Sequence, residues 1–305
     1  GSVSALYLAL AGVGFLRLID QDTVELHNLH RQVLYSLENL RYPKVEAAAK
    51  RIRDLNPNVE VEPIPENIRT DNVEELIKDV DVVVDGLDNI RTRYLLNRAC
   101  AKHRIPYVFG AAIGLEGNLS VFAPPETPCL ECVFPNFKDE ELPTCDVRSV
   151  LGSTTGIIGT LQAMETIKLL ANIGETLKGK LLVCDFENMY FVKLDIPKRS
   201  DCPVCQGVTT EKSPISERLA WLCGHKTVNI NPSRPMLLDL ERIYEKLEKR
   251  FKILLKSSLA IVFEFYGGVE VSLFKNGRML IKNVEDEENA LKIYKSIMNE
   301  LIIEV

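Results

Sequence analysis

Two hydrophobic periodicities alternate along the first two hundred residues of the chain. Short apolar runs bounded by Pro, Gly or Asp predict strands, and the amphipathic stretches between them predict helices. Strands are expected at 15–19, 59–64, 80–85, 107–110, 119–123 and 181–186. Helices are expected at 3–11, 44–55, 91–102 and 156–171. This order predicts an α/β protein with a doubly wound, Rossmann-like and mostly parallel sheet.

A polar segment at 208–216 separates this region from a second, shorter pattern. Its Thr, Ser, Lys and Pro residues are typical of a linker. Beyond it, helices are expected at 237–250 and 285–301, and strands at 259–266 and 269–275. We therefore expect a large domain at 1–209 and a second, smaller α/β domain at 217–305.

Composition and charge argue against several classes of protein. With 305 residues, 46% of them hydrophobic and 26% charged, the chain lies in the globular range. Its 37 basic and 43 acidic residues give a net charge of −6, which argues against a nucleic-acid partner. No segment approaches the roughly 18 uninterrupted apolar residues of a membrane span, and the first residues lack the basic start of a secretory signal. We therefore expect a cytoplasmic protein without a membrane partner.

Two C-x-x-C pairs stand out among the eight cysteines. They are Cys129/Cys132 and Cys202/Cys205. In a reducing compartment such pairs indicate metal ligands, and four thiolates make a closed, tetrahedral Zn²⁺ site. A redox disulfide or unpaired thiols are the alternatives. The sequence thus predicts a structural zinc ion that staples a long loop to the end of the first domain.

Polar residues follow the strand expected at 15–19, at an edge where open α/β sheets bind ligands. The candidates for nucleotide binding are Asp20, Asp22, Asn28, Arg31 and Gln32. In dinucleotide-binding folds an acidic residue that closes the second strand holds a ribose hydroxyl, about 20 residues after a Gly-rich phosphate loop. Counting back from Asp20 reaches Gly1, which is either the last glycine of that loop or a cloning remnant, and its position favours the loop. The alternative for the whole segment is a solvated polar loop.

A second candidate lies at the start of the helix expected at 44–55. Pro43 suits the first turn of a helix, but Arg41 and Lys44 bring positive charge to an end where the helix dipole disfavours it. Phosphate groups held by Lys44 and Arg31, with amide donors from the helix N-terminus, would remove this conflict. Otherwise Lys44 is a surface lysine with a buried stem.

A third candidate lies where the apolar run at 80–85 ends and an acid-rich turn enters the next helix. Asp88 and Asn89 occupy this turn, and either one suits the N-cap of the helix. A carboxylate at the same sheet edge as Asp20 is also where a Mg²⁺ ion that bridges phosphates would bind.

Together these motifs resemble the adenylation domain of the ubiquitin-activating-enzyme superfamily, in the branch that contains MoeB, ThiF and HesA. The similarity lies in residues 20–32, in RYPKVEAA at 41–48, in DGLDN at 85–89, in both C-x-x-C pairs, and in 144–145 and 152–165. It spans residues 1–207, and several ordered motifs in one chain make it specific. The first strand and the Gly-rich loop of that family would precede residue 1.

The resemblance implies an enzyme that uses MgATP. In that family the C-terminal Gly-Gly carboxylate of a small ubiquitin-like protein attacks the α-phosphate of ATP, and pyrophosphate leaves. Asp20 corresponds to the ribose ligand, and Asp88, with Asn89 beside it, corresponds to the catalytic acid that binds Mg²⁺. The phosphate ligands correspond to Asn28, Arg31 and Lys44. The resemblance also implies a homodimer, and partner docking is the natural role for the C-terminal domain.

Cys145 is a candidate of a different kind. Relatives that transfer sulfur or form a thioester use a cysteine in this long loop, and Thr144-Cys145-Asp146 matches its position. MoeB-like enzymes adenylate without such a nucleophile. Asp146 disfavours a thiolate at Cys145 and Arg148 favours one, so the sequence leaves the reactivity of this thiol open.

Two other functions are compatible with parts of the pattern. A non-catalytic scaffold would hold a ubiquitin-like partner through the same fold. An NAD-dependent oxidoreductase would use Asp20 in a Rossmann site, but it gives no role to Lys44, Asp88 or the four paired cysteines. We therefore expect ATP-dependent activation of a ubiquitin-like protein, for sulfur transfer or for protein conjugation.

Overall fold

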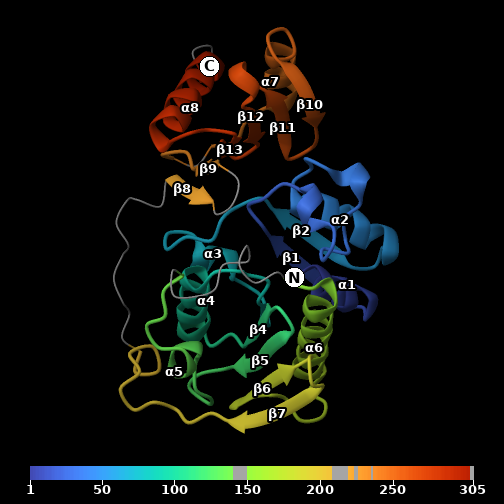
Figure 1. The fold of residues 1–305 in the computed structure, drawn as a ribbon, viewed down its shortest axis with the longest axis vertical. Coiled ribbons are helices and arrows are strands. Elements are labelled where there is room, and N and C mark those ends of the chain that lie inside the picture. The colour runs from blue at the N-terminus through green and yellow to red at the C-terminus, as the bar shows by residue number, and fades with distance from the viewer. Residues whose placement is uncertain (140–149, 208–218, 223–225, 235, 303–305) are drawn as a thin grey trace.

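The computed structural model describes residues 1–139, 150–207, 219–222, 226–234 and 236–302 (Figure 1). Figure 1 shows an α/β part below and an antiparallel sheet with two helices above it. The linker predicted at 208–216 and the candidate nucleophile Cys145 lie outside the described residues. Within the described ranges, no helix combines the length and the apolar character that crossing a membrane requires.

The α/β part alternates helices and strands, as the sequence predicts. Its helices are α1 (Ser2–Leu10), α2 (Lys44–Leu55), α3 (Val73–Leu76), α4 (Ile90–His103), α5 (Leu130–Val133) and α6 (Gly152–Ala171). Its strands are β1 (Phe15–Ile19), β2 (Glu60–Ile64), β3 (Val83–Val84), β4 (Tyr107–Ile113), β5 (Glu116–Phe122), β6 (Lys180–Asp185) and β7 (Tyr190–Asp195). Helix α2 and strand β1 begin and end at the predicted residues.

Among the named strands of the described residues in this part, two pairs are parallel. Strand β1 pairs parallel with β2, and β3 pairs parallel with β4. Between the two strands of each pair, α2 or α4 returns the chain to the end at which the first strand began. Strands β4, β5, β6 and β7 pair antiparallel. Short turns, such as the one at Gly114, join β4 to β5 and β6 to β7, whereas a long segment with α5 and α6 joins β5 to β6. The Rossmann-like α/β class is confirmed, and the sheet is less parallel than the sequence predicted.

Close backbone approach brings α6 against the loop that follows β1. A Cβ atom on Gly152, the first residue of α6, would lie 2.4 Å from the carbonyl oxygen of His30. A Cβ atom on Gly159 would lie 3.0 Å from the Cβ of Val3 in α1. Only glycine allows such contacts, so these two residues fix the position of α6 beside the predicted nucleotide loop.

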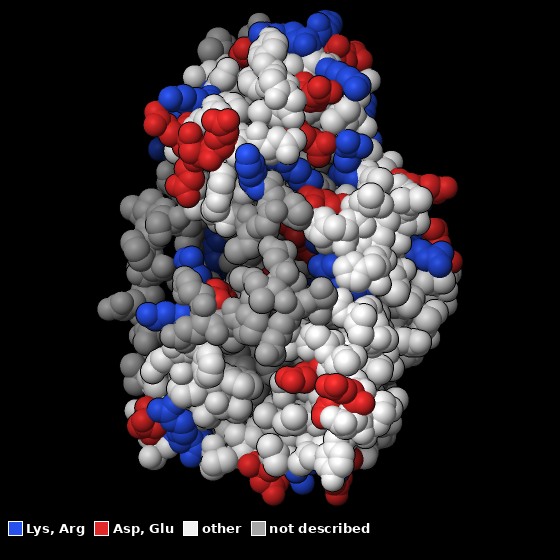
Figure 2. All heavy atoms as spheres, in the orientation of Figure 1, with Lys and Arg blue, Asp and Glu red and all other residues white. Residues whose placement is uncertain are grey.

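The C-terminal unit, which comprises the described residues from 219 to 302, is a six-stranded antiparallel sheet with two helices. Its strands are β8 (Leu219–Leu222), β9 (Thr227–Ile230), β10 (Lys252–Lys256), β11 (Ala260–Glu264), β12 (Glu270–Phe274) and β13 (Met279–Lys282), in the order β10-β11-β12-β13-β9-β8. Its helices are α7 (Leu240–Leu247) and α8 (Glu287–Ile302). Buried residues of both helices share one apolar core with the sheet. Figure 2 shows charged side chains of both signs gathered over this unit.

Candidate functional site

A cleft of about 2240 Å³ extends over the carboxyl ends of β1 and β3, and residues of β8 and β13 of the C-terminal unit also line it. All eight residues predicted to bind nucleotide line it. They are Asp20, Asp22, Asn28, Arg31, Gln32, Lys44, Asp88 and Asn89. The structure thus brings these eight side chains to one cleft, as expected where strand ends meet at one edge of a sheet.

Lys44 connects the start of α2 to the loop after β1. Its Nζ lies 2.9 Å from Oδ2 of Asp22, and its backbone N–H donates to the carbonyl oxygen of Asp22 at 2.9 Å. The Asp22 backbone N–H in turn donates to Oδ1 of Asp20 at 2.8 Å. The positive charge that the sequence places at this helix start is thus compensated within the chain by Asp22. Because its side chain is only 7% exposed, Lys44 is a buried cation and not a surface lysine.

Burial and neighbouring charges shift the pKa values of Asp20, Asp22 and Lys44 in different directions. Burial raises the pKa of Asp20 above its ordinary range. Burial also disfavours the charged forms of Asp22 and Lys44. The charge of Lys44 nevertheless lowers the pKa of Asp22, and the charges of Asp20 and Asp22 raise the pKa of Lys44. The cation at Lys44 is therefore retained at neutral pH beside two carboxylates, as a site for polyanionic phosphate requires.

The loop beyond Asp22 presents three further polar residues to the cleft. Asn28 ends a short 3₁₀ helix (Leu26–Asn28) and is buried. Arg31 is half-buried, and its Nη1 donates to the carbonyl oxygen of His27 at 3.3 Å. The side-chain Oε1 of Gln32 is buried and finds no hydrogen-bond partner within the described part of the chain. Because an unpaired buried acceptor is costly, Gln32 is suited to a ligand that donates a hydrogen bond.

Asp88 and Asn89 have different positions although they are neighbours. The side chain of Asn89 accepts a hydrogen bond from the backbone N–H of Thr92 at 2.9 Å, which makes Asn89 the N-cap of α4. Asp88 is exposed in the cleft, and Nδ2 of Asn89 lies 3.3 Å from its Oδ1. The capping role thus falls to Asn89, and the Asp88 carboxylate stays accessible to a ligand or a cation.

A buried ion pair beneath this turn was not predicted from the sequence. Nε of Arg93 lies 2.9 Å from Oδ2 of Asp85, which is 1% exposed. Nη2 of Arg93 donates to the carbonyl oxygens of Leu87 and Gly110, and the Gln162 amide donates to the Asp85 carbonyl oxygen at 2.7 Å. These contacts hold the 85–89 turn in place. The available signal was Asp85 itself, a carboxylate that directly follows three valines.

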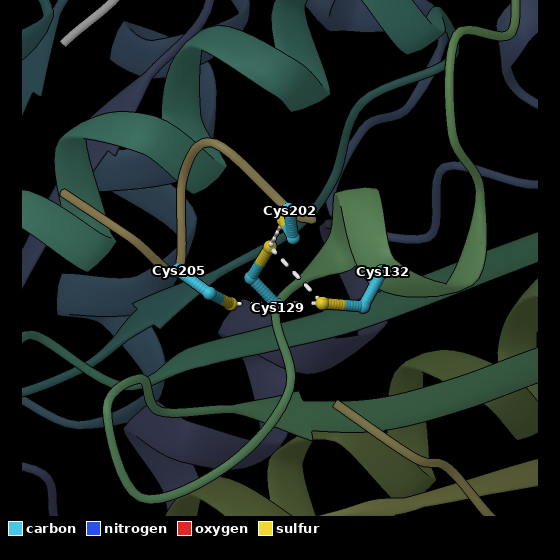
Figure 3. Close-up of side chains that lie close together, drawn as sticks. All are labelled: Cys129, Cys132, Cys202 and Cys205. Atoms are coloured by element: carbon cyan, nitrogen blue, oxygen red, sulfur yellow. Dashed lines mark hydrogen bonds between the residues drawn. The ribbon is translucent and has the colours of Figure 1, made fainter. Parts of the chain in front are cut away.

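The four paired cysteines form one cluster beside α5 (Figure 3). All four sulfur atoms lie within 4.8 Å of one another, with Cys129 3.6 Å from Cys202 and Cys132 3.6 Å from Cys205. These distances exclude disulfides, whose sulfur atoms are about 2 Å apart. Four sulfurs around a zinc ion at about 2.3 Å lie about 3.8 Å apart, so the cluster has the size of a zinc site. Cys100 and Cys184 are buried elsewhere.

The fold and the cleft define an α/β protein of the Rossmann type with its ligand site at the strand ends. The chain belongs to the ThiF family, whose sequence profile matches residues 1–204. Sequence similarity extends to the adenylyltransferase and sulfurtransferase MOCS3 of Aedes aegypti, which is 42% identical over 247 residues, 80% of this chain and 56% of that protein. The SAMP-activating enzyme E1 of Haloferax volcanii is 42% identical over 206 residues, 67% of this chain and 76% of that protein.

Solved structures support the fold. A crystal structure of E. coli MccB with ATP superposes with a TM-score of 0.59 at 22% identity, covering 67% of this chain and 63% of that one. The chain spans little more than half the length of the MOCS3 relatives.

Proposed function

We propose that this protein activates the C-terminal carboxylate of a ubiquitin-like protein by adenylation with MgATP. The observation that carries the proposal is the gathering of a buried cation, Lys44, and an accessible carboxylate, Asp88, in one cleft of a ThiF-family chain. A carboxylate oxygen of the partner protein attacks the α-phosphorus, the bond to the β-phosphate oxygen breaks, and pyrophosphate leaves. The printed names of the MOCS3 and SAMP-activating relatives support this substrate class.

The cleft residues divide the work of positioning and charge neutralisation, which such a displacement needs more than a covalent protein group. Asp20 accepts the ribose hydroxyls, because it closes β1 and its oxygen atoms line the cleft. Lys44 and Arg31 neutralise the phosphate oxygens. Asp22 keeps Lys44 extended into the cleft through their 2.9 Å ion pair.

Asp88 is the proposed ligand of the magnesium ion. Mg²⁺ takes oxygen ligands and neutralises the charge that develops on the leaving pyrophosphate. Asp88 is suited to this role because it is exposed in the cleft and has no ion pair within the described residues. Asn28, Gln32 and Asn89 supply neutral donors and acceptors around the nucleotide.

ATP–pyrophosphate exchange tests the proposal directly. The full-length protein is assayed with each small protein of the same genome that ends in Gly-Gly. We expect exchange that depends on one such partner, and its loss by at least about a hundredfold in Asp88→Asn. Asp54→Asn is the matched control, since Asp54 is an exposed carboxylate of α2 that does not line the cleft. Partner binding by the zinc-loaded protein without exchange would instead establish the scaffold function.

Zinc is the proposed occupant of the cysteine cluster. The cluster is largely buried, contains four thiols at the right separation and offers no open position for substrate. It joins α5 to the segment at 202–205, so the metal has a structural role. The reducing compartment in which such thiols persist favours the cytoplasm.

Cys145 remains a proposed nucleophile on the strength of the sequence alone. If it receives the activated carboxylate, Cys145→Ser keeps pyrophosphate exchange and abolishes a partner adduct that is sensitive to thiols. If sulfur is delivered by another route, both exchange and thiocarboxylate formation survive the substitution. Mass spectrometry of the partner protein distinguishes these outcomes.

A homodimer is proposed from an exposed apolar surface. Strand β7 is exposed along its whole length, with Tyr190 67% and Leu194 48% exposed. In α6, Ile157 is 40% and Met164 is 54% exposed, two turns apart on one face. Apolar side chains exposed along an edge strand and on one face of a helix are typical of a subunit interface.

A further inference from the structure

Arg278 of the C-terminal unit is fully buried, although it stands in the turn that leads into β13. Its exposure is 0%, and its guanidinium carbon lies 3.7 Å from the centre of the Phe274 ring. Burial lowers the pKa of Arg278, and the carboxylates of Asp22 and Glu66 oppose that shift. A buried guanidinium is costly unless its donors are used, so its partners indicate what it does.

Two of those partners belong to the α/β part of the chain. Nη2 of Arg278 donates to the carbonyl oxygen of Gln21 at 2.6 Å, and Nε donates to the carbonyl oxygen of Pro65 at 3.1 Å. Gln21 follows β1 and Pro65 follows β2, so a single side chain joins the carboxyl ends of both parallel strands. Nη1 donates to Oδ1 of Asn229 in β9 at 2.8 Å, which anchors the guanidinium in its own unit.

Lys282 makes a second contact with the same loop. Its Nζ lies 3.0 Å from Oγ1 of Thr23 and 2.5 Å from a carboxylate oxygen of Glu25. The loop segment 21–25 is therefore held from above by two cations of β13 and the turn before it. From below, Asp22 of the same segment holds Lys44.

The contacts form a continuous path from the C-terminal unit into the proposed nucleotide site. Arg278 bonds Gln21, which lies between Asp20 and Asp22 in the chain, and Asp22 bonds Lys44. A hydrogen bond at its carbonyl oxygen restrains the backbone of this segment, so a backbone movement that carries Asp20 and Asp22 away from the cleft would break that bond. The C-terminal unit also lines the cleft with Trp221 and Lys282, so it is part of the wall and not a distant attachment.

We propose that Arg278 is a positioning residue for nucleotide binding. Together with Lys282, it lets the C-terminal unit hold the loop at 20–25 in the geometry that presents Asp20 and Lys44 to ATP. This inference rests on the proposed function for the identity of the ligand. It assigns to the C-terminal unit a task that is separate from docking a protein partner.

The test compares Arg278→Gln and Arg278→Lys with the wild-type full-length protein. Equilibrium binding of a fluorescent ATP analogue with Mg²⁺ is measured without any partner protein, followed by exchange kinetics with it. We expect the dissociation constant and the KM for ATP to rise about tenfold or more in Arg278→Gln, because the charged hydrogen bonds to the carbonyl oxygens of Gln21 and Pro65 are lost. The KM for the partner protein is expected to change by less than about twofold, and Arg278→Lys is expected to recover part of the ATP affinity.

Hydrogen exchange of the backbone amides reports on the loop itself. In Arg278→Gln, amides of residues 21–25 are expected to exchange faster, whereas those in β11 of the same sheet keep their protection. Lys282→Gln is a second, milder variant for the case that Arg278→Gln folds poorly, since Lys282 is partly exposed. It is expected to change loop exchange and ATP affinity in the same direction.

Matched controls lie on the other side of the C-terminal unit. Arg250 pairs with Glu300 at 2.8 Å and Lys252 pairs with Glu264 at 3.5 Å, both at exposed positions. Arg250→Gln and Lys252→Gln are expected to leave loop exchange and ATP affinity unchanged.

If the Arg278 and Lys282 variants lower thermal stability but keep wild-type ATP affinity and loop exchange, the residues are merely structural and the inference is overturned. If the wild type binds no ATP while the variants still loosen the loop, the proposed function fails instead.

Discussion

Asp88 and Asn89 are adjacent, yet their different surroundings predict opposite consequences of substitution. Asn89 caps α4, so Asn89→Ala is expected to cost about 1 kcal/mol, which lowers the melting temperature by about 2–4 °C. Asp88 is exposed, so Asp88→Asn is expected to change stability by less than about 0.5 kcal/mol while it abolishes exchange. Thermal melts and exchange assays on both variants check this pair. A large loss of stability in Asp88→Asn would show that Asp88 supports the turn and does not act on the ligand.

The buried pair of Arg93 and Asp85 predicts a much larger effect on stability. Arg93→Met leaves the Asp85 carboxylate buried without its cation, at an expected cost of about 3–5 kcal/mol. Adding Asp85→Asn to Arg93→Met is expected to recover part of that cost, because the unpaired charge is removed. Arg250→Met is the control, since its ion pair is exposed and is expected to contribute less than about 1 kcal/mol. Equal destabilisation by Arg93→Met and Arg250→Met would contradict this account.

Residues whose role depends on local position could be predicted from the sequence, and residues whose role depends on distant partners could not. Asp20, Lys44 and Asp88 stand at the ends of strands or the start of a helix, and the topology alone brings them to one edge. Arg278 has partners 213 and 257 residues earlier in the chain. No local pattern indicates such contacts. The proposed role of Arg278 could therefore be inferred only from the structure of both parts of the chain.

At the scale of elements, the spacing and length of apolar runs decided which helices and strands the sequence could predict. Strand β1 and helix α2 have apolar positions at the expected spacing and were predicted at their observed bounds. Strand β7 was missed although its residues are exposed at the edge of the sheet. The buried strands β9 and β13 were missed as well, because four residues between turns leave little periodicity. The antiparallel turn from β4 to β5 depends on Gly114 at φ 55°, which the sequence pattern did not separate from an ordinary loop.

The cysteine cluster predicts a metal dependence that is local to one end of the α/β part. Metal analysis is expected to find about one zinc ion per chain, and Cys132→Ser or a strong chelator is expected to remove it and to lower the melting temperature. Because Glu131 of α5 pairs with Arg98 of α4, loosening is expected to spread to α4 but not to the C-terminal unit. Hydrogen exchange locates the change.

Cys100→Ala is the control for that experiment. Cys100 is buried in the core of α4 away from the cluster, so its substitution is expected to lower stability slightly while zinc content is unchanged. A folded protein that contains no metal and melts at the same temperature with and without chelator would remove the zinc proposal.

At the scale of the whole molecule, the distribution of exposed apolar side chains predicts how two copies associate. Tyr190, Val192 and Leu194 alternate along β7 and therefore share one face of the strand, and all three are more than a third exposed. Helix α6 adds Ile157 and Met164. Leaving such side chains in water costs free energy that burial against a second copy recovers, at about 25 cal/mol for each Å² of apolar surface.

Charged substitutions on this surface are therefore expected to separate the subunits without unfolding them. Met164→Glu combined with Val192→Glu is expected to convert a dimer into a monomer in light scattering at micromolar concentration, because each charge would have to be buried twice in a symmetric interface. Leu237→Glu is the matched control, since Leu237 is 79% exposed in the C-terminal unit and lies outside this surface. A wild-type protein that is monomeric at these concentrations would contradict the homodimer. A double variant that remains dimeric with an unchanged melting temperature would place the interface elsewhere. If the double variant is instead monomeric, its pyrophosphate exchange reports whether one copy alone completes the nucleotide site.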